Sequence, residues 1–339
     1  MAKILITGAT GFIGFHLTRA LLDQGHEISC LVRKSSKLDR LAGLPIRRAD
    51  GDVTDAESLR RVVSEYDAVY HLAGLVKAIH VQELYRVNCE GVANMARACA
   101  AQTTPPVLLV VSSLAAMGPS SPQRPRLESD PPLPVSNYGR SKLAGEHAAR
   151  QWAKEVPITI LRPPVVFGEA DPATYEIFRP IARCGIHVVP SWQTHRVSLI
   201  HADDLLQAMI LAAQRGKRIL CDPADKVAAA QGCYFTPAER DLTYAEMGRM
   251  MGTALGRPRT CVLRLGPIAV WAFGLVATIF SHLRGQSTYF NLDKAREARA
   301  GSWTCSGAAA VRDLGFAVTT PLNERMRQTA HWYREQGWL

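Results

Sequence analysis

Short apolar runs alternate with longer segments of helical periodicity through the first half of the chain. The segments between the runs repeat their apolar residues every three or four positions, which predicts helices at Phe12–Gln24, Ala56–Ser64, Val81–Ala101 and Asn137–Glu155. The runs themselves are rich in apolar and β-branched residues, which predicts strands at Lys3–Thr7, Glu27–Val32, Ile46–Ala49, Ala68–Leu72, Val107–Ser112 and Ile158–Leu161. This alternation is typical of βαβ units, so it predicts an α/β fold with a doubly wound parallel sheet.

The pattern loosens after Pro163, where glycine and proline interrupt it more often. Further helices are predicted at Tyr175–Cys184, Ala202–Arg215, Thr243–Leu255 and Leu322–Gln336. We therefore predict one domain over residues 1–165 and a smaller, discontinuous lobe over 166–339, some segments of which return to the first domain. The stretch Gly118–Pro134 holds six prolines and is expected to form a loop that overhangs a site.

The segment Gly266–Leu283 contains no charged residue and is flanked by Arg264 and Arg284. Its length is near the lower limit for crossing a bilayer, but glycine, proline, serine and histidine residues dilute its apolar character. Two interpretations stay open here. The segment contacts a membrane or covers an apolar substrate, or it is a helix that packs against its own lobe. Peripheral membrane contact is favoured over spanning.

Composition narrows the function classes. The chain has 339 residues, of which 47% are hydrophobic and 21% charged, as in ordinary globular proteins. The net charge of +10 is spread along the chain without long basic runs, which argues against a nucleic-acid partner and favours a solvated basic surface. Eight single cysteines lack the spacing of a metal site. Because no secretory signal precedes the first strand, a cytoplasmic location is expected, with membrane association through 266–283 as an alternative.

A glycine-rich turn directly follows the first strand and opens the first helix. Gly8 permits a sharp turn, Gly11 lets the backbone approach a pyrophosphate, and Gly14 allows close packing of helix and sheet. The helix N-terminus adds free N–H groups and a partial positive charge. The turn therefore predicts a dinucleotide, with contacts from Gly8, Thr10, Gly11, Phe12, Ile13 and Gly14.

The spacing of these glycines, Gly-x-x-Gly-x-x-Gly, resembles that of the extended short-chain dehydrogenase/reductase superfamily, the epimerase/dehydratase family. The resemblance implies a Rossmann-type cofactor domain over residues 1–165 and a substrate lobe after it. It also implies cofactor contacts at three later segments: Asp52 and Val53 at the adenine, Leu72, Ala73 and Gly74 beside the riboses and phosphates, and Pro163 and Val166 at the nicotinamide.

The end of the second predicted strand bears on the choice between NADP and NAD. Family members that prefer NAD carry an acidic residue there, whereas this chain reads Leu31-Val32-Arg33-Lys34. Arg33 is able to pair with a 2′-phosphate through a charge-assisted fork. We therefore expect NADP to be preferred, with NAD as the alternative and an ordinary exposed arginine as the competing interpretation of Arg33.

Tyr138 and Lys142 are four residues apart in a predicted helix and therefore share one face. A phenol is a poor base at neutral pH unless a nearby cation stabilises the phenolate, and Lys142 is able to supply that cation. Resemblance to the family then assigns Ser113, with Ser112 as the alternative, to the reacting oxygen, and Asn88 to the proton relay. For Asn88 a purely structural role is almost equally expected. Tyr138 is expected to act as the acid/base during hydride transfer.

The segment Ile200–Leu205 resembles another family signature, in which Asp203 and Asp204 are expected to cap a helix. Nucleotide-sugar epimerases of the family carry an arginine four residues before His201, where this chain has Val197, with Arg196 one place earlier. A shift of one residue turns a strand side chain to the opposite face.

That departure, together with Val32-Arg33 and the apolar segment Gly266–Leu283, leads us to predict an NAD(P)-dependent oxidoreductase acting on a small, apolar molecule, similar to dihydroflavonol reductases and 3β-hydroxysteroid dehydrogenases. A nucleotide-sugar epimerase or dehydratase with tightly bound NAD is the first alternative. A non-catalytic dinucleotide-binding regulator is the second. By analogy with relatives, the helices at Val81–Ala101 and Asn137–Glu155 are able to form a homodimer. No metal is expected.

Overall fold

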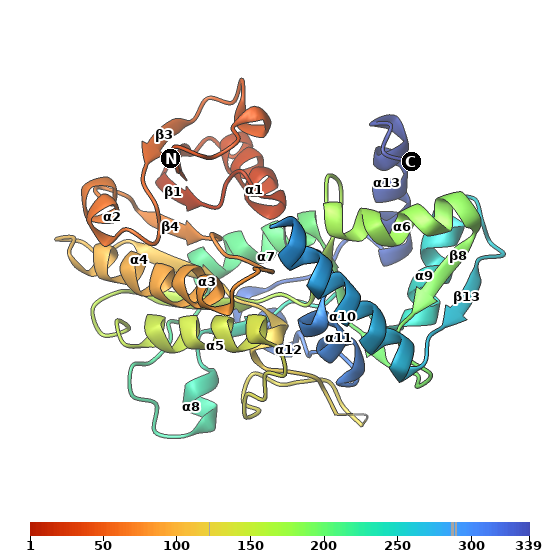
Figure 1. Ribbon diagram of the computed structural model, residues 1–339. Coiled ribbons are helices and arrows are strands. Elements are labelled where there is room, and N and C mark those ends of the chain that lie inside the picture. The colour runs from red at the N-terminus through yellow and green to blue at the C-terminus, as the bar shows by residue number, and fades with distance from the viewer. Residues whose placement is uncertain (122, 286–287, 289) are drawn as a thin grey trace.

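A seven-stranded parallel sheet forms the centre of the protein in this computed structural model, which describes residues 1–121, 123–285, 288 and 290–339 (Figure 1). Its strand order is β11-β6-β5-β4-β1-β2-β3, and every neighbouring pair is parallel. The strands are β1 (Lys3–Thr7), β2 (Glu27–Val32), β3 (Arg47–Asp50), β4 (Ala68–His71), β5 (Val107–Val111), β6 (Ile158–Arg162) and β11 (Cys233–Phe235). The predicted doubly wound sheet is confirmed.

Helices cover both faces of this sheet because successive strand residues point to opposite sides. Leu5 packs in the core under one layer and Ile6 in the core under the other, and both are fully buried. One layer holds α1 (Phe12–Asp23), α7 (Ala202–Arg215) and α12 (Ala308–Leu314). The other holds α2 (Ala56–Val62), α3 (Val81–Tyr85), α4 (Gly91–Ala100) and α5 (Asn137–Arg150).

The predicted helix Val81–Ala101 differs from the structure at its centre, where a π-helical turn (η2, Arg86–Glu90) joins α3 to α4. The extra residue of a π turn releases backbone groups from the regular helical ladder, and such turns often occur at functional sites. Asn88 lies in the turn. Its carbonyl oxygen would be only 2.1 Å from a Cβ placed on Gly145, so α5 packs very closely here. A periodicity argument alone does not detect this irregularity.

A second core lies beside the sheet, among elements mainly from the later part of the chain. Its helices are α6 (Pro172–Cys184), α9 (Tyr244–Ala254) and α13 (Leu322–Glu335), and the small η3 (Leu114–Ala116) touches it. Three two-stranded pairs complete the lobe: β7 (Val165–Phe167) with β10 (Leu199–His201), β9 (Arg196–Val197) with β12 (Leu242–Thr243), and β8 (Ile186–Val189) with β13 (Cys261–Arg264). The remaining short elements are η1 (Asp39–Leu41), α8 (Lys226–Ala230) and α11 (Leu292–Arg299).

Three elements from the second half, β11, α7 and α12, belong to the sheet and its helical layer. The division of the chain at residue 165 stays a prediction.

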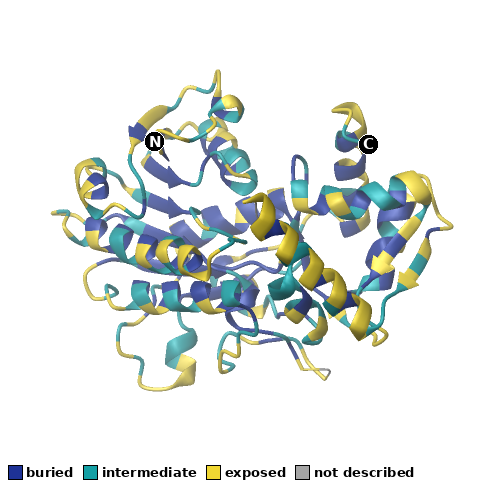
Figure 2. Ribbon diagram, in the orientation of Figure 1, coloured by how far each residue is buried: buried dark blue, intermediate teal, exposed yellow. Residues whose placement is uncertain are grey.

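The apolar segment near residue 275 forms an 18-residue helix, α10 (Pro267–Arg284), which lies diagonally across the front of the molecule in Figure 1. Most of it is exposed, as its yellow ribbon in Figure 2 shows, and only 17% of its residues are buried. The buried ones are Val270, Gly274 and Ser281. With a mean hydropathy of 1.3 it is the one helix among the described residues that is long and apolar enough to cross a membrane, which by itself is weak evidence for spanning. These three residues form the narrow face through which α10 packs against the rest of the protein.

Candidate active site

The glycine turn after β1 has the shape of a phosphate cradle. Gly8 has a φ of 73°, and a Cβ there would lie 2.8 Å from the amide nitrogen of Ala73. A Cβ on Gly14 would be 2.2 Å from the carbonyl oxygen of Gly8. Gly11 is the N-cap of α1 and provides no side-chain cap, so N–H groups of the first turn are available to a ligand. Thr10, Phe12 and Ile13 lie on the same turn, and the residues present fit a pyrophosphate.

The segment after β4 passes between this turn and the helix α5. The Ala73 amide donates to the Thr7 hydroxyl at 3.0 Å. A Cβ on Gly74 would lie 3.0 Å from Asn88 Oδ1, a tight contact, and 3.5 Å from Lys142 Nζ, so the lack of a side chain at Gly74 keeps this passage of the backbone beside the two side chains uncrowded. Leu72, Ala73 and Gly74 therefore line the space between the glycine turn and α5.

Arg33 and Asp52 lie at the carboxyl ends of the neighbouring strands β2 and β3, where the Gly51 amide donates to the Val32 carbonyl at 3.0 Å. The Arg33 side chain is exposed. Asp52 is half-buried, and its Oδ1 accepts from both the amide and the hydroxyl of Thr54 at 2.9 Å. Val53 is buried. This edge of the sheet is therefore able to receive the adenosine end of a dinucleotide.

Tyr138 is the second residue of α5, which begins at its N-cap Ser136. The hydroxyl of Ser113 interacts with the phenol and lowers its pKa. Ser112 points away, because its hydroxyl donates to Glu146. Burial raises the pKa of Tyr138, although the charge of Lys294 and the interaction with Ser113 partly oppose that effect. Of the two candidate serines, Ser113 is the one that meets Tyr138.

Lys142 lies one helical turn beyond Tyr138, as its spacing predicts, and is buried. Its ammonium donates to the Val111 carbonyl oxygen at 2.6 Å. Burial lowers the pKa of Lys142 to about 8, although Glu146 favours the charged form. The ammonium therefore lies at the carboxyl end of β5, beside the passage at Gly74.

Asn88 fixes the walls of the site through its side chain. Its Oδ1 accepts from the Leu75 amide at 2.8 Å, and its Nδ2 donates to the Leu75 carbonyl at 2.8 Å and to the Ser141 hydroxyl at 2.9 Å. These bonds join the segment after β4 to α5. The side chain thus has a positioning role in this structure, and its part in a proton relay stays a prediction.

A buried ion pair joins β6 to α5, the helix that carries Tyr138 and Lys142. Arg162, at the end of β6, donates to Glu146 of α5 from Nε at 3.0 Å and from Nη2 at 2.7 Å. The two side chains are 6% and 3% exposed. Burial alone would raise the pKa of Glu146, but Arg162 outweighs that effect and lowers it. Sequence reasoning missed this pair, because nothing in either segment marks two residues 16 apart as partners.

Pro163 and Val166 follow β6, near the carboxyl ends of the strands. Pro163 is buried, and its carbonyl accepts from the Leu114 amide at 2.9 Å, next to Ser113. Val166 is half-buried in β7. A hydrogen bond thus joins Pro163 to the residue that follows Ser113.

The short helix α11 contributes residues that the sequence analysis did not select. The Asp293 carboxylate accepts from the amides of Asn137 at 2.8 Å and Tyr138 at 3.1 Å, at the N-terminus of α5. Glu297 accepts from the Ser136 hydroxyl at 2.5 Å. Lys294 Nζ lies 5.3 Å from the centre of the Tyr138 ring. In the sequence, this segment has the pattern of an ordinary charged surface helix, so no local signal identifies it.

The prediction that Asp203 and Asp204 cap α7 is wrong. His201 is the N-cap, and its ring accepts from the Asp203 amide, while both aspartates bind Arg325 of α13 at 2.8 and 2.9 Å. Glu169, His201 and Asp203 bring ligand atoms within 4.8 Å of one another, a spacing that a metal ion could bridge. Because Asp203 is already paired with Arg325, the cluster is accounted for as an ion-pair network between lobes.

Arg196 and Val197 of β9 point to opposite faces, as the sequence predicts. Val197 is buried and Arg196 is exposed, with its guanidinium donating to the Asp241 carbonyl at 3.3 Å. The position four residues before His201 is therefore occupied by a buried valine.

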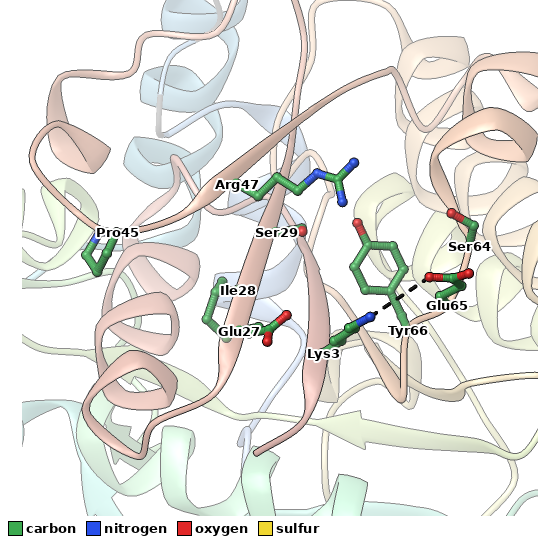
Figure 3. Close-up of a pocket in the computed structure, with 9 residues that line it drawn as sticks. All are labelled: Lys3, Glu27, Ile28, Ser29, Pro45, Arg47, Ser64, Glu65 and Tyr66. Carbon is green, nitrogen blue, oxygen red and sulfur yellow. Dashed lines mark ion pairs between the residues drawn. The ribbon is translucent and has the colours of Figure 1, made fainter.

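A surface hollow at the other end of the sheet is lined by residues of β1, β2, β3 and the segment before β4, among them Lys3, Glu27, Arg47 and Tyr66 (Figure 3). Lys3 and Glu65 are 3.9 Å apart across it and are both exposed. Open α/β sheets bind their ligands at the carboxyl ends of the strands, whereas this hollow is at the amino ends. It is therefore not the candidate active site.

Geometry and comparison lead to the same class. The cradle after β1 and the strand order define a Rossmann-type dinucleotide-binding protein. The model of the NAD dependent epimerase/dehydratase family matches residues 4–221. This chain belongs to that family and is an NAD(P)-dependent oxidoreductase, which confirms the predicted class and sets aside the non-catalytic alternative.

Similar proteins cover nearly the whole chain. A ceramide reductase from Caulobacter vibrioides is 32% identical over 99% of this chain and 96% of its own length. A sterol demethylase protein B from Methylococcus capsulatus is 31% identical, with 99% of each chain covered. Proteins named for dihydroflavonol 4-reductase and 3β-hydroxysteroid dehydrogenase also match, as predicted. Among solved structures, a UDP-glucose 4-epimerase from Thermotoga maritima shares the fold, with a TM-score of 0.76, 17% identity and coverage of 98% of this chain and 99% of that chain.

Proposed function

We propose that this enzyme is an NADP-preferring carbonyl reductase or alcohol dehydrogenase for a lipid-like substrate. The observation that carries the proposal is that Tyr138 interacts with Ser113, while Lys142, one turn along the same helix, lies beside Gly74 and binds the end of β5. The relatives that are at least 30% identical are named for ceramide and sterol chemistry, which supports an apolar substrate. The position at which nucleotide-sugar epimerases of the family carry an arginine holds the buried Val197 in strand β9, which disfavours a nucleotide sugar.

The bound nicotinamide supplies or accepts the hydride. Tyr138 is proposed to give its phenolic proton to the carbonyl oxygen during reduction and to take it back during oxidation. Ser113, which interacts with the phenol, polarises that same oxygen. Lys142, beside Gly74, would hold the nicotinamide ribose, and Asn88 binds the Leu75 amide and Ser141 of α5, which keeps the segment after β4 against α5.

Substrate screening tests the reaction. With NADPH present, a long-chain ketone related to ceramide and a 3-ketosteroid are each expected to oxidise the cofactor, whereas UDP-glucose should not. An epimerase recycles its hydride within one site, so conversion of UDP-glucose without net cofactor oxidation would reject the proposal. Oxidation of NADPH by neither ketone would reject the lipid-like substrate class.

Arg33→Ala tests the cofactor preference. A bidentate bond between the guanidinium and a 2′-phosphate contributes about 1.5–3 kcal/mol, so the affinity for NADPH should fall about tenfold or more while that for NADH stays the same. Fluorescence titration of the reduced nicotinamide measures both affinities. Arg47→Ala removes an exposed arginine from the opposite end of β3 and is the matched control (Figure 3). Tighter binding of NADH by the unaltered enzyme would overturn the preference.

Peripheral membrane contact through α10 is part of the proposal. The helix exposes a continuous apolar surface that includes Ile268, Phe273, Val276, Ile279 and Leu283. Arg264 precedes it, Arg284 ends it and Arg299 packs beneath Trp271, so cations lie beside the apolar surface. An interfacial helix of this kind favours a bilayer with anionic lipids. A cytoplasmic enzyme that docks on such a bilayer would meet lipid substrates directly.

Val276→Asp combined with Leu283→Asp should reduce binding to vesicles that contain phosphatidylglycerol by about tenfold or more, because two strongly exposed apolar residues are lost. Sedimentation with vesicles measures the bound fraction. Val227→Asp adds the same charge to an exposed position on α8, remote from α10 in Figure 1, and should leave binding unchanged. Equal binding of all three proteins would contradict the membrane contact. Dimerisation through α4 and α5 stays a prediction by resemblance.

A further inference from the structure

The helix α11 contacts α5, the helix that carries Tyr138 and Lys142, through residues that do not belong to the cofactor cradle. Asp293 accepts from two backbone amides at the start of α5, and Glu297 accepts from the N-cap hydroxyl of Ser136. Free N–H groups at a helix N-terminus favour carboxylates, and these two come from a segment more than 150 residues later. The first turn of α5, which carries Tyr138, is therefore held by α11.

Lys294 lies between those two carboxylates in the sequence, and its ammonium lies over the ring of Tyr138. Its Nζ is 5.3 Å from the centre of the Tyr138 ring and 2.6 Å from Glu297 Oε2. A cation over an aromatic ring at this distance is attracted to the ring, and much more strongly to a phenolate. Lys142, by contrast, donates to the Val111 carbonyl.

We propose that Lys294 is a second cation of the active site, a positioning residue that stabilises the Tyr138 phenolate from the C-terminal lobe. The inference rests on the proposed role of Tyr138. The two lysines then have different roles: Lys142 binds the cofactor, and Lys294 stabilises the Tyr138 phenolate.

The charges around the phenol give the direction of the effect. Lys294 lowers the pKa of Tyr138 and Glu297 raises it, both from α11, while Lys142 lies one turn along α5 and Asp293 binds the Tyr138 amide. Burial lowers the pKa of Lys294, but Glu297 outweighs it, so Lys294 stays charged at neutral pH. Removing Lys294 should therefore raise the Tyr138 pKa.

Lys294→Met, with Lys294→Arg as its charge-preserving control, tests the assignment. Reduction needs the protonated phenol, so its rate falls as pH rises through the Tyr138 pKa. Oxidation needs the phenolate and rises over the same range. Loss of a cation 5.3 Å from the ring centre should move the pH profiles of both reduction and oxidation to higher pH by about one unit. Lys294→Arg should leave both profiles near their original position. NADPH affinity should be the same in all three proteins.

A second measurement does not depend on a known substrate. The ultraviolet absorbance of tyrosinate is titrated with NADP bound, and the difference between each protein and its Tyr138→Phe counterpart isolates the Tyr138 midpoint. A midpoint about one unit higher in Lys294→Met would support the proposal even if no tested ketone is turned over. Coincident midpoints in Lys294→Met and the unaltered enzyme would overturn it, whatever the activity. Lys294→Gln replaces Lys294→Met should the latter fail to fold.

Discussion

Tyr138→Phe is expected to lower the turnover of the proposed ketone substrate by about 100- to 10,000-fold, the usual contribution of a positioned general acid. The substitution removes only the phenolic oxygen and its interaction with Ser113, and it leaves the ring beneath Lys294 in place. Binding of NADPH should change little, because the glycine cradle and Lys142 are untouched. Steady-state rates and a fluorescence titration on the same preparation measure the two effects.

Tyr66→Phe is the matched control for this experiment. Tyr66 lines the hollow at the amino ends of the strands, at the other end of the sheet from the candidate active site, so its activity should equal that of the unaltered enzyme (Figure 3). Turnover by Tyr138→Phe at more than a tenth of the normal rate would show that another group moves the proton. Loss of NADPH binding in the same variant would show that the substitution disturbs the cradle instead.

Glu146→Ala is expected to lower the free energy of unfolding by about 3–5 kcal/mol, because it leaves the Arg162 guanidinium buried without its partner. It also removes the acceptor of the Ser112 hydroxyl. Denaturant titration measures the loss. Replacing both partners, with Glu146→Leu and Arg162→Met, should recover much of the stability, since a buried pair is often no more stabilising than apolar side chains of similar size.

Glu176→Ala, in an exposed pair with Arg179 on α6, supplies the comparison for Glu146→Ala and should cost only about 0.2–1 kcal/mol. The pH dependence adds a second check. Because the folded-state pKa of Glu146 lies below its ordinary value, its contribution is complete above the unfolded pKa and is lost as pH falls through the folded pKa. An equal loss of stability in Glu146→Ala and Glu176→Ala would contradict the structural role of the buried pair.

Much of the fold could be predicted from local patterns. The bounds of β1, β2 and α7 agree with the predicted segments, since a short continuous apolar run and an apolar stripe of period 3.6 are each encoded by neighbouring residues. The same holds for the cradle, where Gly8 and Gly14 are required by contacts within the turn and with the adjacent strand. The local pattern did not predict the centre of the helical segment after β4. The π turn there contains Asn88, where α5 packs very closely, and that contact depends on a distant segment of the chain.

The sequence by itself determined the class of enzyme, the position of the cradle and the pairing of Tyr138 with Lys142 on one helix face, because each depends on residues a few positions apart. Only the tertiary structure decided that Ser113 rather than Ser112 meets Tyr138, that Arg162 pairs with Glu146, and that α11 brings Lys294 to the phenol. Each of those contacts joins elements that are distant along the chain. Their side chains become neighbours only once strands, helices and lobes have packed, and no local periodicity records that arrangement.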